Sequence, residues 1–377
     1  MRRQLQTFDP REEYARSPEY AEVVATLNAG IDPSVHLPPP PTSEYATSLG
    51  RQMILCIRRA FLNKFRQPQQ IRAFILMYIV MGLIIGSLYW QLDDTQLGAR
   101  NRVALVYFST IFAALGAFAA VPGVVLSRAT YYREKPSFLR PFAFFVAQSL
   151  SEVPFTCIAT WCYSVVIYFM AGLNLADYGL RVVLFAFVYS FASVLAVAFA
   201  QMVAVLSPSQ ESASTTVGVS LSILSLFAGF IIPKLSIEWY WRWLHYLSIF
   251  KYPLEALSIN EMLGETFGCP DGQGALSVAT SNYTFVVRTQ SKLSTLIDTR
   301  ARTLGTTEVQ STNTRLLVRS FQPYCPISSG TQFIAMQFDM NQDWKHFWMD
   351  VGAMGILYTF MLIVTYIGVR FVNHMRR

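Results

Sequence analysis

Long apolar stretches separated by charged segments dominate the chain. Each stretch is close to the roughly 20 residues that a helix needs to cross the hydrocarbon core of a bilayer. This length argues against the alternative, buried helices of a large soluble protein. The pattern therefore predicts an all-α membrane protein with six spanning helices, at residues 73–92, 103–127, 153–176, 182–206, 212–233 and 350–370.

Two polar segments precede the first span. Residues 1–47 have mixed charge and a proline run at 38–41, which favours an extended cytoplasmic linker. Residues 48–66 place apolar side chains on one helical face and arginines and lysines on the other. Such a basic amphipathic helix is typical of a membrane surface, although packing on a partner protein would give the same pattern.

The stretch LFAGFIIPKLSIEWYWRWLHYLSIFKY, residues 226–252, changes character halfway. It begins as hydrocarbon and then gathers Trp and Tyr residues, whose rings concentrate at the headgroup level of membranes. Residues 235–260 carry too many charges to span. We expect short helices there that lie at, or dip back into, the outer leaflet.

Charge sets the expected orientation. The chain is 53% hydrophobic and 14% charged, with a formal net charge of +7, whereas soluble domains carry about 25% charged residues. Lys and Arg gather before span one, between spans two and three, and after span six, which predicts cytoplasmic termini. The positive charge follows from this asymmetry, so it does not indicate a nucleic-acid partner.

This orientation makes residues 262–345 a long extracellular loop before span six. Cys269 and Cys325 would share its oxidising side, so a disulfide between them is expected, with two free thiols as the alternative. Asn282 begins an Asn-Tyr-Thr sequon and is a candidate glycosylation site. Residues 280–290 favour short strands or irregular structure.

Enzyme motifs are missing from the sequence. It contains no Gly-x-x-x-x-Gly-Lys-Ser/Thr loop, so no ATPase site and no catalytic residue is assigned to this chain. Its four histidines are scattered without metal-ligand spacing, and no metal site or bound cofactor is expected. ATP and Mg²⁺ would bind to a nucleotide-binding domain elsewhere. No ring-forming polar residues recur along a span, which disfavours a passive channel.

The connection between spans two and three is long, charged and amphipathic. It reads SRATYYREKPSFLRPFAFFVAQSLSEVPF from residue 127 to 155. We interpret it as a cytoplasmic coupling element in which Arg133 and Glu134 contact a motor domain, with a solvated salt-bridged loop as the alternative. Glu152 precedes span three, and a carboxylate at a membrane entrance needs a partner or water. Its candidate partners are Arg128, Arg133 and Lys135.

The same connection and the stretch at residues 226–261 resemble two motifs of one transporter family. YYREKPSFLRPFAFFVAQSLSEVPF is similar to the stretch between the second and third spans of G-subfamily ABC transporters, the White and pleiotropic-drug-resistance type. LFAGFIIPKLSIEWYWRWLHYLSIFKYPLEALSINE resembles the signature at the end of their span five. The resemblance covers most of residues 40–377.

The resemblance implies the ABC-2, or type V exporter, transmembrane domain, working as a pair. Residues 48–66 would be its amphipathic connecting helix and residues 67–377 its membrane domain, with a re-entrant segment after span five that ends at Asn260 and Glu261. Arg133 and Glu134 would lie in the coupling hairpin that meets the nucleotide-binding domain, and Glu152 in a polar relay below it.

Phe230 and Ile231 would form the outer gate, where the family often has two leucines. The departure from leucine implies a gate of the same polarity and a different shape. We further expect spans two and five to line the substrate cavity, with Phe108, Phe112, Val219 and Leu226 as candidate lining residues.

The function expected from these features is that of the permease domain of an ATP-driven exporter in the plasma membrane. It would move amphipathic, lipid-like or drug-like molecules by alternating access, with a second transmembrane half and a nucleotide-binding domain as partners. The alternatives are a lipid or glycan exporter with a separate ATPase chain, and a non-transporting scaffold or relic. Family members carry an ATPase domain ahead of this region, so a truncation, a fragment and a separate permease subunit all stay open.

Overall fold

The computed structural model describes residues 14–29, 45, 47–134, 139–175, 179–267, 275–280, 283–288, 309–311, 314–316, 329–340 and 343–372. These residues divide into two units, Met1–Ala46 and Thr47–Arg377. The described part of the first unit includes helix α2 (Pro18–Ala29), which lies inside the segment expected to be an extended linker. The proline run at 38–41, from which an extended conformation was expected, lies outside the described residues.

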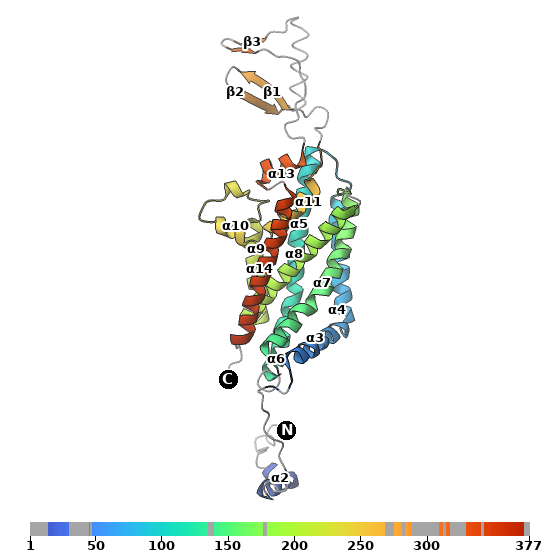
Figure 1. Cartoon of the computed structure of the whole chain (residues 1–377), viewed down its shortest axis with the longest axis vertical. Helices are drawn as coiled ribbons and strands as arrows, with labels where there is room; N and C mark the ends of the chain where they lie inside the picture. The colour runs from blue at the N-terminus through green and yellow to red at the C-terminus, as the bar shows by residue number, and fades with distance from the viewer. Residues whose placement is uncertain are drawn as a thin grey trace, which may run out of the picture. The chain divides into compact units, whose positions relative to one another are not determined.

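The second unit is a bundle of long helices (Figure 1). Helix α3 lies at one end, which we call the α3 end, and helix α11 lies near the other, the α11 end. The helices that form the bundle are α3 (Leu49–Phe65), α4 (Pro68–Leu88), α5 (Gln96–Gly116), α6 (Ala120–Glu134), α7 (Pro141–Ala171), α8 (Leu180–Leu206), α9 (Gln210–Leu226) and α14 (Trp344–Phe371).

Helix α8 forms the centre of the bundle. It packs against α5, α6, α7, α9, α11 and α14, and most of its side chains are buried. Many of those side chains are alanine or serine, which lets neighbouring helices approach closely, as is usual where apolar association alone cannot drive packing in lipid. Tyr189 on α8 stacks on Tyr163 of α7 with ring centroids 4.8 Å apart. The core therefore combines small residues with a few large rings.

Five helices in the described part of the chain are long and apolar enough to cross a membrane. They are α4, the continuous stretch Leu97–Glu134, α7, α8 and α14. The expected span five, at residues 212–233, is not among them, because α9 has 17 residues and ends at Leu226. Gly229 follows with a φ of 104° and Pro233 lies beyond, so the chain leaves the helical conformation before the expected end.

The connection between the second and third spans is more helical than expected. Helix α6 continues to Glu134, and α7 begins at Pro141 rather than near residue 153. Pro154 therefore lies inside α7 instead of opening a span. A 3-10 turn, η1 (Ala117–Ala119), separates α5 from α6, which places Pro122 in the first turn of α6, where its missing N–H is tolerated.

Short elements cover the α11 end. They are η3 (Lys234–Ser236), α10 (Arg242–Leu247), α11 (Lys251–Met262) and α13 (Gly330–Phe338), and the expected short helices after residue 233 are thus present. Strands β1 (Ala275–Thr280) and β2 (Tyr283–Arg288) pair antiparallel with Ala275 opposite Arg288, and β3 (Val309–Ser311) pairs with β4 (Thr314–Leu316). Cys269, Cys325 and Asn282 lie outside the described residues.

Candidate functional site

Two ion pairs fasten α3 to the bundle. Arg59 donates to the carboxylate of Glu134 at the end of α6, with 2.6 Å between Nη1 and Oε1. The Nζ atom of Lys64 lies 2.6 Å from Oε1 of Glu152 on α7. The hydrogen bond to Glu134 raises the pKa of the Arg59 guanidinium, which keeps the guanidinium charged. The α3 helix can therefore transmit a displacement to both α6 and α7.

The partner of Glu152 differs from the three candidates named from sequence. Its partner is Lys64, a residue of α3 that lies far away in the chain. Arg128 instead donates to carbonyl oxygens at the end of α8, those of Ala204 and Ser207, the latter at 2.9 Å. Lys135 lies outside the described residues, and Arg133 is exposed beside Glu134. The sequence signal that could have found Lys64 is its position on the polar edge of the amphipathic helix.

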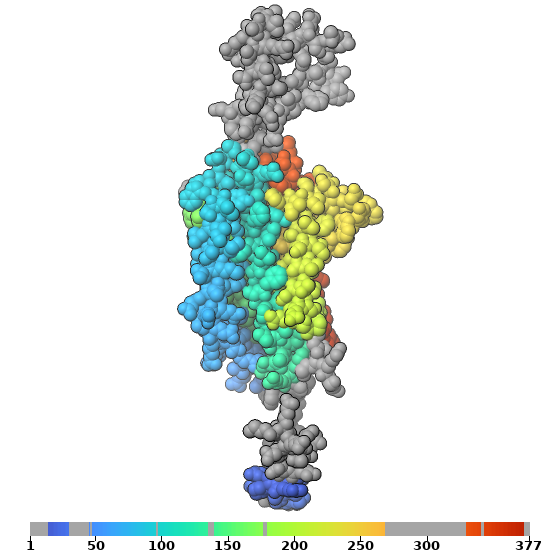
Figure 2. Space-filling view, turned by 180° about the vertical axis from the view of Figure 1, so that it is seen from behind, coloured from blue at the N-terminus to red at the C-terminus, as the bar shows by residue number. Residues whose placement is uncertain are grey.

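Helices α5 and α9 share an apolar face that the single chain leaves exposed. Figure 2 shows α9 lying beside α5 and α6 on one face, and the Tyr107 hydroxyl of α5 donates to the Ser225 carbonyl of α9 at 3.2 Å. Phe108, Val219 and Leu226 are exposed on these helices. Phe112 is 6% exposed and packs inside the bundle against Tyr78, with centroids 4.9 Å apart. Phe112 therefore packs inside the bundle, behind the exposed face of α5 and α9, and is not part of that face.

Phe230 lies in a stack of three rings beyond the end of α9. Its ring is 4.6 Å from that of Tyr107 on α5 and 5.4 Å from that of Phe338 at the end of α13. Ile231, the second predicted gate residue, is 52% exposed. The stack joins α5, the segment after α9 and α13, so one aromatic side chain links three elements at the α11 end of the apolar face.

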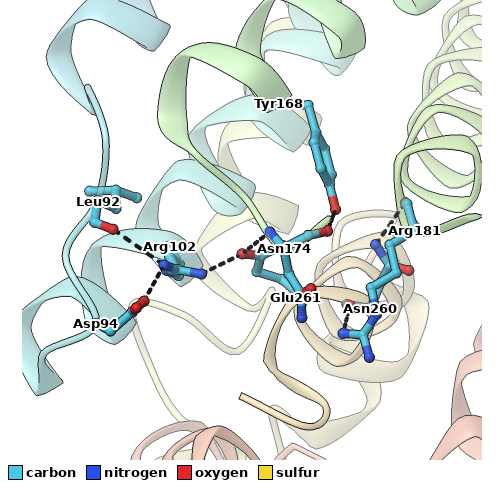
Figure 3. Close-up of polar contacts among 8 residues, drawn as sticks. All are labelled: Leu92, Asp94, Arg102, Tyr168, Asn174, Arg181, Asn260 and Glu261. Carbon is cyan, nitrogen blue, oxygen red and sulfur yellow. Dashed lines mark hydrogen bonds and ion pairs between the residues drawn. The ribbon is translucent and has the colours of Figure 1, made fainter. Parts of the chain in front are cut away.

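A buried polar cluster holds α11 against α5 and the start of α8 (Figure 3). Arg102 of α5 donates to the Glu261 carboxylate of α11 and to the Asp94 carboxylate, at 2.8 Å each. The same guanidinium also donates to the Leu92 carbonyl at 3.2 Å. The backbone N–H of Asn174 completes the site by donating to Glu261 at 3.1 Å. Glu261 therefore accepts hydrogen bonds from helix α5 and from the connection between α7 and α8.

The second half of the cluster is a reciprocal pair between α8 and α11. Arg181 donates to the Asn260 carbonyl at 2.9 Å, and the Asn260 side-chain amide donates back to the Arg181 carbonyl at 3.1 Å. Arg102 is 3% exposed and Arg181 is 6% exposed. Their burial shows that they are structural residues, which the apolar runs around them did not reveal.

The fold and these sites define a class of protein, a multi-pass membrane domain. At one end an amphipathic helix is held by ion pairs, and at the other end short helices are held by a buried polar cluster. The comparison with known families agrees. The family model for ABC-2 type transporters matches residues 51–262, and the chain belongs to this family.

Its relatives are G-family ABC transporters. ABC transporter G family member 3 of Dictyostelium discoideum is 28% identical over 97% of this chain and 23% of its own length. The ABC multidrug transporter G of Aspergillus fumigatus is 24% identical over 98% of this chain and 25% of its own length. The broad substrate specificity ATP-binding cassette transporter ABCG2 of Sus scrofa is 29% identical over 63% of this chain and 36% of its own length. The chain thus spans between about a quarter and a third of these relatives.

Proposed function

We propose that the chain is the permease domain of an ATP-driven exporter for amphipathic molecules. The observation that carries the proposal is the exposed apolar face of α5 and α9 in a chain of the ABC-2 family. An apolar face of this kind in a membrane domain is stable against lipid or against a second copy. Two copies facing each other across α5 and α9 would enclose an apolar passage whose lining includes Phe108, Val219 and Leu226.

The ion pairs at the α3 end suit this domain for coupling to a motor. Glu134, with Arg133 beside it, ends α6, and Glu152 lies one helix further along the chain. Both carboxylates are bound to α3 by salt bridges. A nucleotide-binding domain that pushed the 128–141 segment would move α6, α7 and α3 together. ATP and Mg²⁺ would bind to that partner domain, on the cytoplasmic side, where the Lys and Arg bias places the α3 end.

The Phe230 stack supports the role of an outer gate. It lies at the α11 end of the apolar face and connects α5 to the elements beyond α9. Rotation of α5 would separate Tyr107 from Phe230 and so open the passage by alternating access. Names of relatives such as "multidrug transporter" and "broad substrate specificity" are consistent with an uncharged, apolar passage, and we propose amphipathic, drug-like or lipid-like substrates on that ground.

Purification from the source cells tests this proposal. We expect an ATP-binding cassette domain on the same polypeptide or on one that co-purifies, identified by mass spectrometry. Inside-out vesicles containing the purified protein should accumulate a fluorescent amphiphile when ATP is added and not with a non-hydrolysable analogue. Recovery without any such domain, together with no ATP-dependent accumulation, would favour a non-transporting membrane protein instead.

A further inference from the structure

A polar cleft lies at the α3 end, between α3, α6 and α7. Its volume is about 370 Å³, which falls within the roughly 300–1,000 Å³ of small-molecule sites. The side chains on which the inference depends are Arg59, Asn63, Lys64, Gln67, Gln148 and Glu152. They come from helices other than α9 and its exposed apolar face. The cleft is therefore distinct from the proposed passage.

A second, smaller slot of about 50 Å³ adjoins this cleft, and most of its lining residues are apolar, with Gln70 and Thr156 among the polar ones. Ile71 and Phe74 of α4, Phe155 of α7 and Val197 of α8 line it. Lys64 and Glu152 line both cavities, so their ion pair lies where the polar cleft meets the apolar slot. Going from the cleft into the slot, the lining changes from polar residues to the ion pair and then to aromatic and aliphatic residues. This order matches that of the headgroup and the acyl chain in an amphiphile.

The charges at the cleft are balanced. Arg59 is paired with Glu134, and Lys64 is paired with Glu152, at 2.6 Å in each case. Basic pockets without carboxylates at such a depth suit anionic lipid headgroups. Here an anion would meet a carboxylate beside each cation. A zwitterionic headgroup can satisfy both, because its phosphate accepts from a cation while its ammonium group approaches a carboxylate.

We propose that this cleft binds one zwitterionic phospholipid from the leaflet at the α3 end. The phosphate would lie against Lys64 and Arg59, the ammonium group near Glu152, and the first part of one acyl chain in the slot beside Phe74 and Phe155. The amides of Gln67 and Gln148 can serve the glycerol and ester oxygens. This inference does not depend on transport, because it uses only the geometry of the cleft and the slot.

Lipid retention by the purified full chain in a neutral detergent tests the proposal. Native mass spectrometry would compare phosphatidylcholine, phosphatidylglycerol and diacylglycerol, each added at the same concentration. We expect phosphatidylcholine to be retained about tenfold more than either of the others, since phosphatidylglycerol lacks the quaternary ammonium charge that would face Glu152 and diacylglycerol lacks both charges. Equal retention of diacylglycerol, or better retention of phosphatidylglycerol, would overturn the proposal.

Two variants address the site directly. Lys64→Gln combined with Glu152→Gln should lower phosphatidylcholine retention about tenfold. The matched control, Lys234→Gln with Asp339→Asn, removes an ion pair at the other end of the bundle, where the two charged atoms are 3.9 Å apart, and should leave retention unchanged. Unchanged retention in the first variant, or an equal fall in the control, contradicts the proposal.

The second variant keeps every charge and is expected to fold, so a loss of lipid retention in it cannot be assigned to misfolding. Gly123 of α6 lines the cleft, and a Cβ atom there would have a single neighbour within 4 Å, Oε1 of Glu152 at 3.9 Å. Gly123→Leu favours the helix and fills the cleft, so it should reduce phosphatidylcholine retention while the protein stays monodisperse in gel filtration. Full retention in this folded variant would exclude the cleft as the site.

Discussion

The Arg102–Glu261 pair is the most deeply buried ion pair in the described part of the chain. The side chains are 4% and 1% exposed. Removal of the Glu261 charge leaves Arg102 with the exposed Asp94 and the Leu92 carbonyl, and breaking a buried ion pair typically costs up to about 3–5 kcal/mol. Glu261→Gln should therefore lower the melting temperature of the purified protein in detergent by many degrees.

Asp94 provides the control for this prediction. It bonds the same guanidinium at 2.8 Å, but its side chain is 69% exposed. Exposed ion pairs contribute about 0–1 kcal/mol, so Asp94→Asn should melt close to the parent protein. Equal losses in Glu261→Gln and Asp94→Asn would show that burial does not determine the contribution of this cluster.

The environment of His245 predicts that the stability of the α11 end depends on pH. Its Nδ1 lies 2.8 Å from the Phe227 carbonyl oxygen, and burial lowers the pKa of the imidazole below its ordinary value. As pH falls through the ordinary histidine range, the unfolded segment takes up a proton before the folded one does, so stability falls with it. At neutral and higher pH both states are neutral and no effect is expected.

Hydrogen exchange of α10 and tryptophan fluorescence would detect this change. Trp241 stacks on Phe227 with centroids 5.9 Å apart, so it reports on the same packing. We expect faster exchange and altered fluorescence at acidic pH, both absent in His245→Gln. An identical acid response in His245→Gln would assign the effect to another group.

At the residue scale, sequence reasoning found the carboxylates and missed their partners. Glu134 and Glu152 stood out because charge near an apolar run needs compensation. The pairing with Arg59 and Lys64 depends on how α3 packs across α6 and α7, which no local pattern encodes. Nothing in the sequence indicated that Arg102 and Arg181 are buried, because burial against α11 is a tertiary effect.

Helix packing depends on glycines at close contacts. A Cβ atom added to Gly368 of α14 would lie 2.7 Å from Cγ1 of Val205 on α8, so one helix would have to shift. Overpacking of this kind costs about 1–3 kcal/mol. Gly368→Ala should therefore lower thermal stability in detergent.

Gly352, on the same helix, is the matched control. A Cβ atom there meets nothing within 4 Å. Since alanine favours a helix over glycine by up to about 1 kcal/mol, Gly352→Ala should leave stability unchanged or raise it. A loss as large as that of Gly368→Ala would mean that backbone freedom matters more than helix contact.

At the element scale, the hydropathy pattern predicted most of the helices correctly but placed the ends of some of them wrongly. Runs of apolar residues found α4, α8 and α14, because length in hydrocarbon is a strong signal. Residues 212–233 stay apolar beyond Leu226, where α9 ends. The backbone turns at Gly229, which has a positive φ, and hydropathy carries no information on backbone angles. The start of α7 was placed too late because the polar residues Gln148, Ser149, Ser151 and Glu152 interrupt its apolar positions after the first two turns.

The Phe230 stack gives a prediction for the whole molecule. Phe230→Ala removes two ring contacts, at 4.6 and 5.4 Å, each worth about 0.5–1.5 kcal/mol. The closed gate should become leaky, so ATP-dependent accumulation of a fluorescent amphiphile in inside-out vesicles should fall several-fold while ATP hydrolysis continues.

Trp239→Ala serves as the control for the gate. Trp239 is exposed and has no ring contact with Phe230 among the described residues. Its removal should leave accumulation unchanged. Full accumulation in Phe230→Ala would show that Phe230 is not part of a gate, and it would not contradict the membrane fold.

At the scale of the whole molecule, the sequence supported a membrane domain of this family, and the family match confirms it. The pairing of two copies stays a proposal, because an exposed apolar face suits lipid and protein equally. Orientation likewise rests on the Lys and Arg bias, since the fold of a helical bundle does not distinguish its two ends.

Cysteine labelling in intact cells tests the central claim most directly, namely that the α3 end faces the cytoplasm and a motor domain. Arg133→Cys and Trp239→Cys would each be made in a chain whose five native cysteines are replaced. We predict that a membrane-impermeant maleimide labels Trp239→Cys on intact cells and Arg133→Cys only after permeabilisation. Labelling of Arg133→Cys on intact cells would contradict the account.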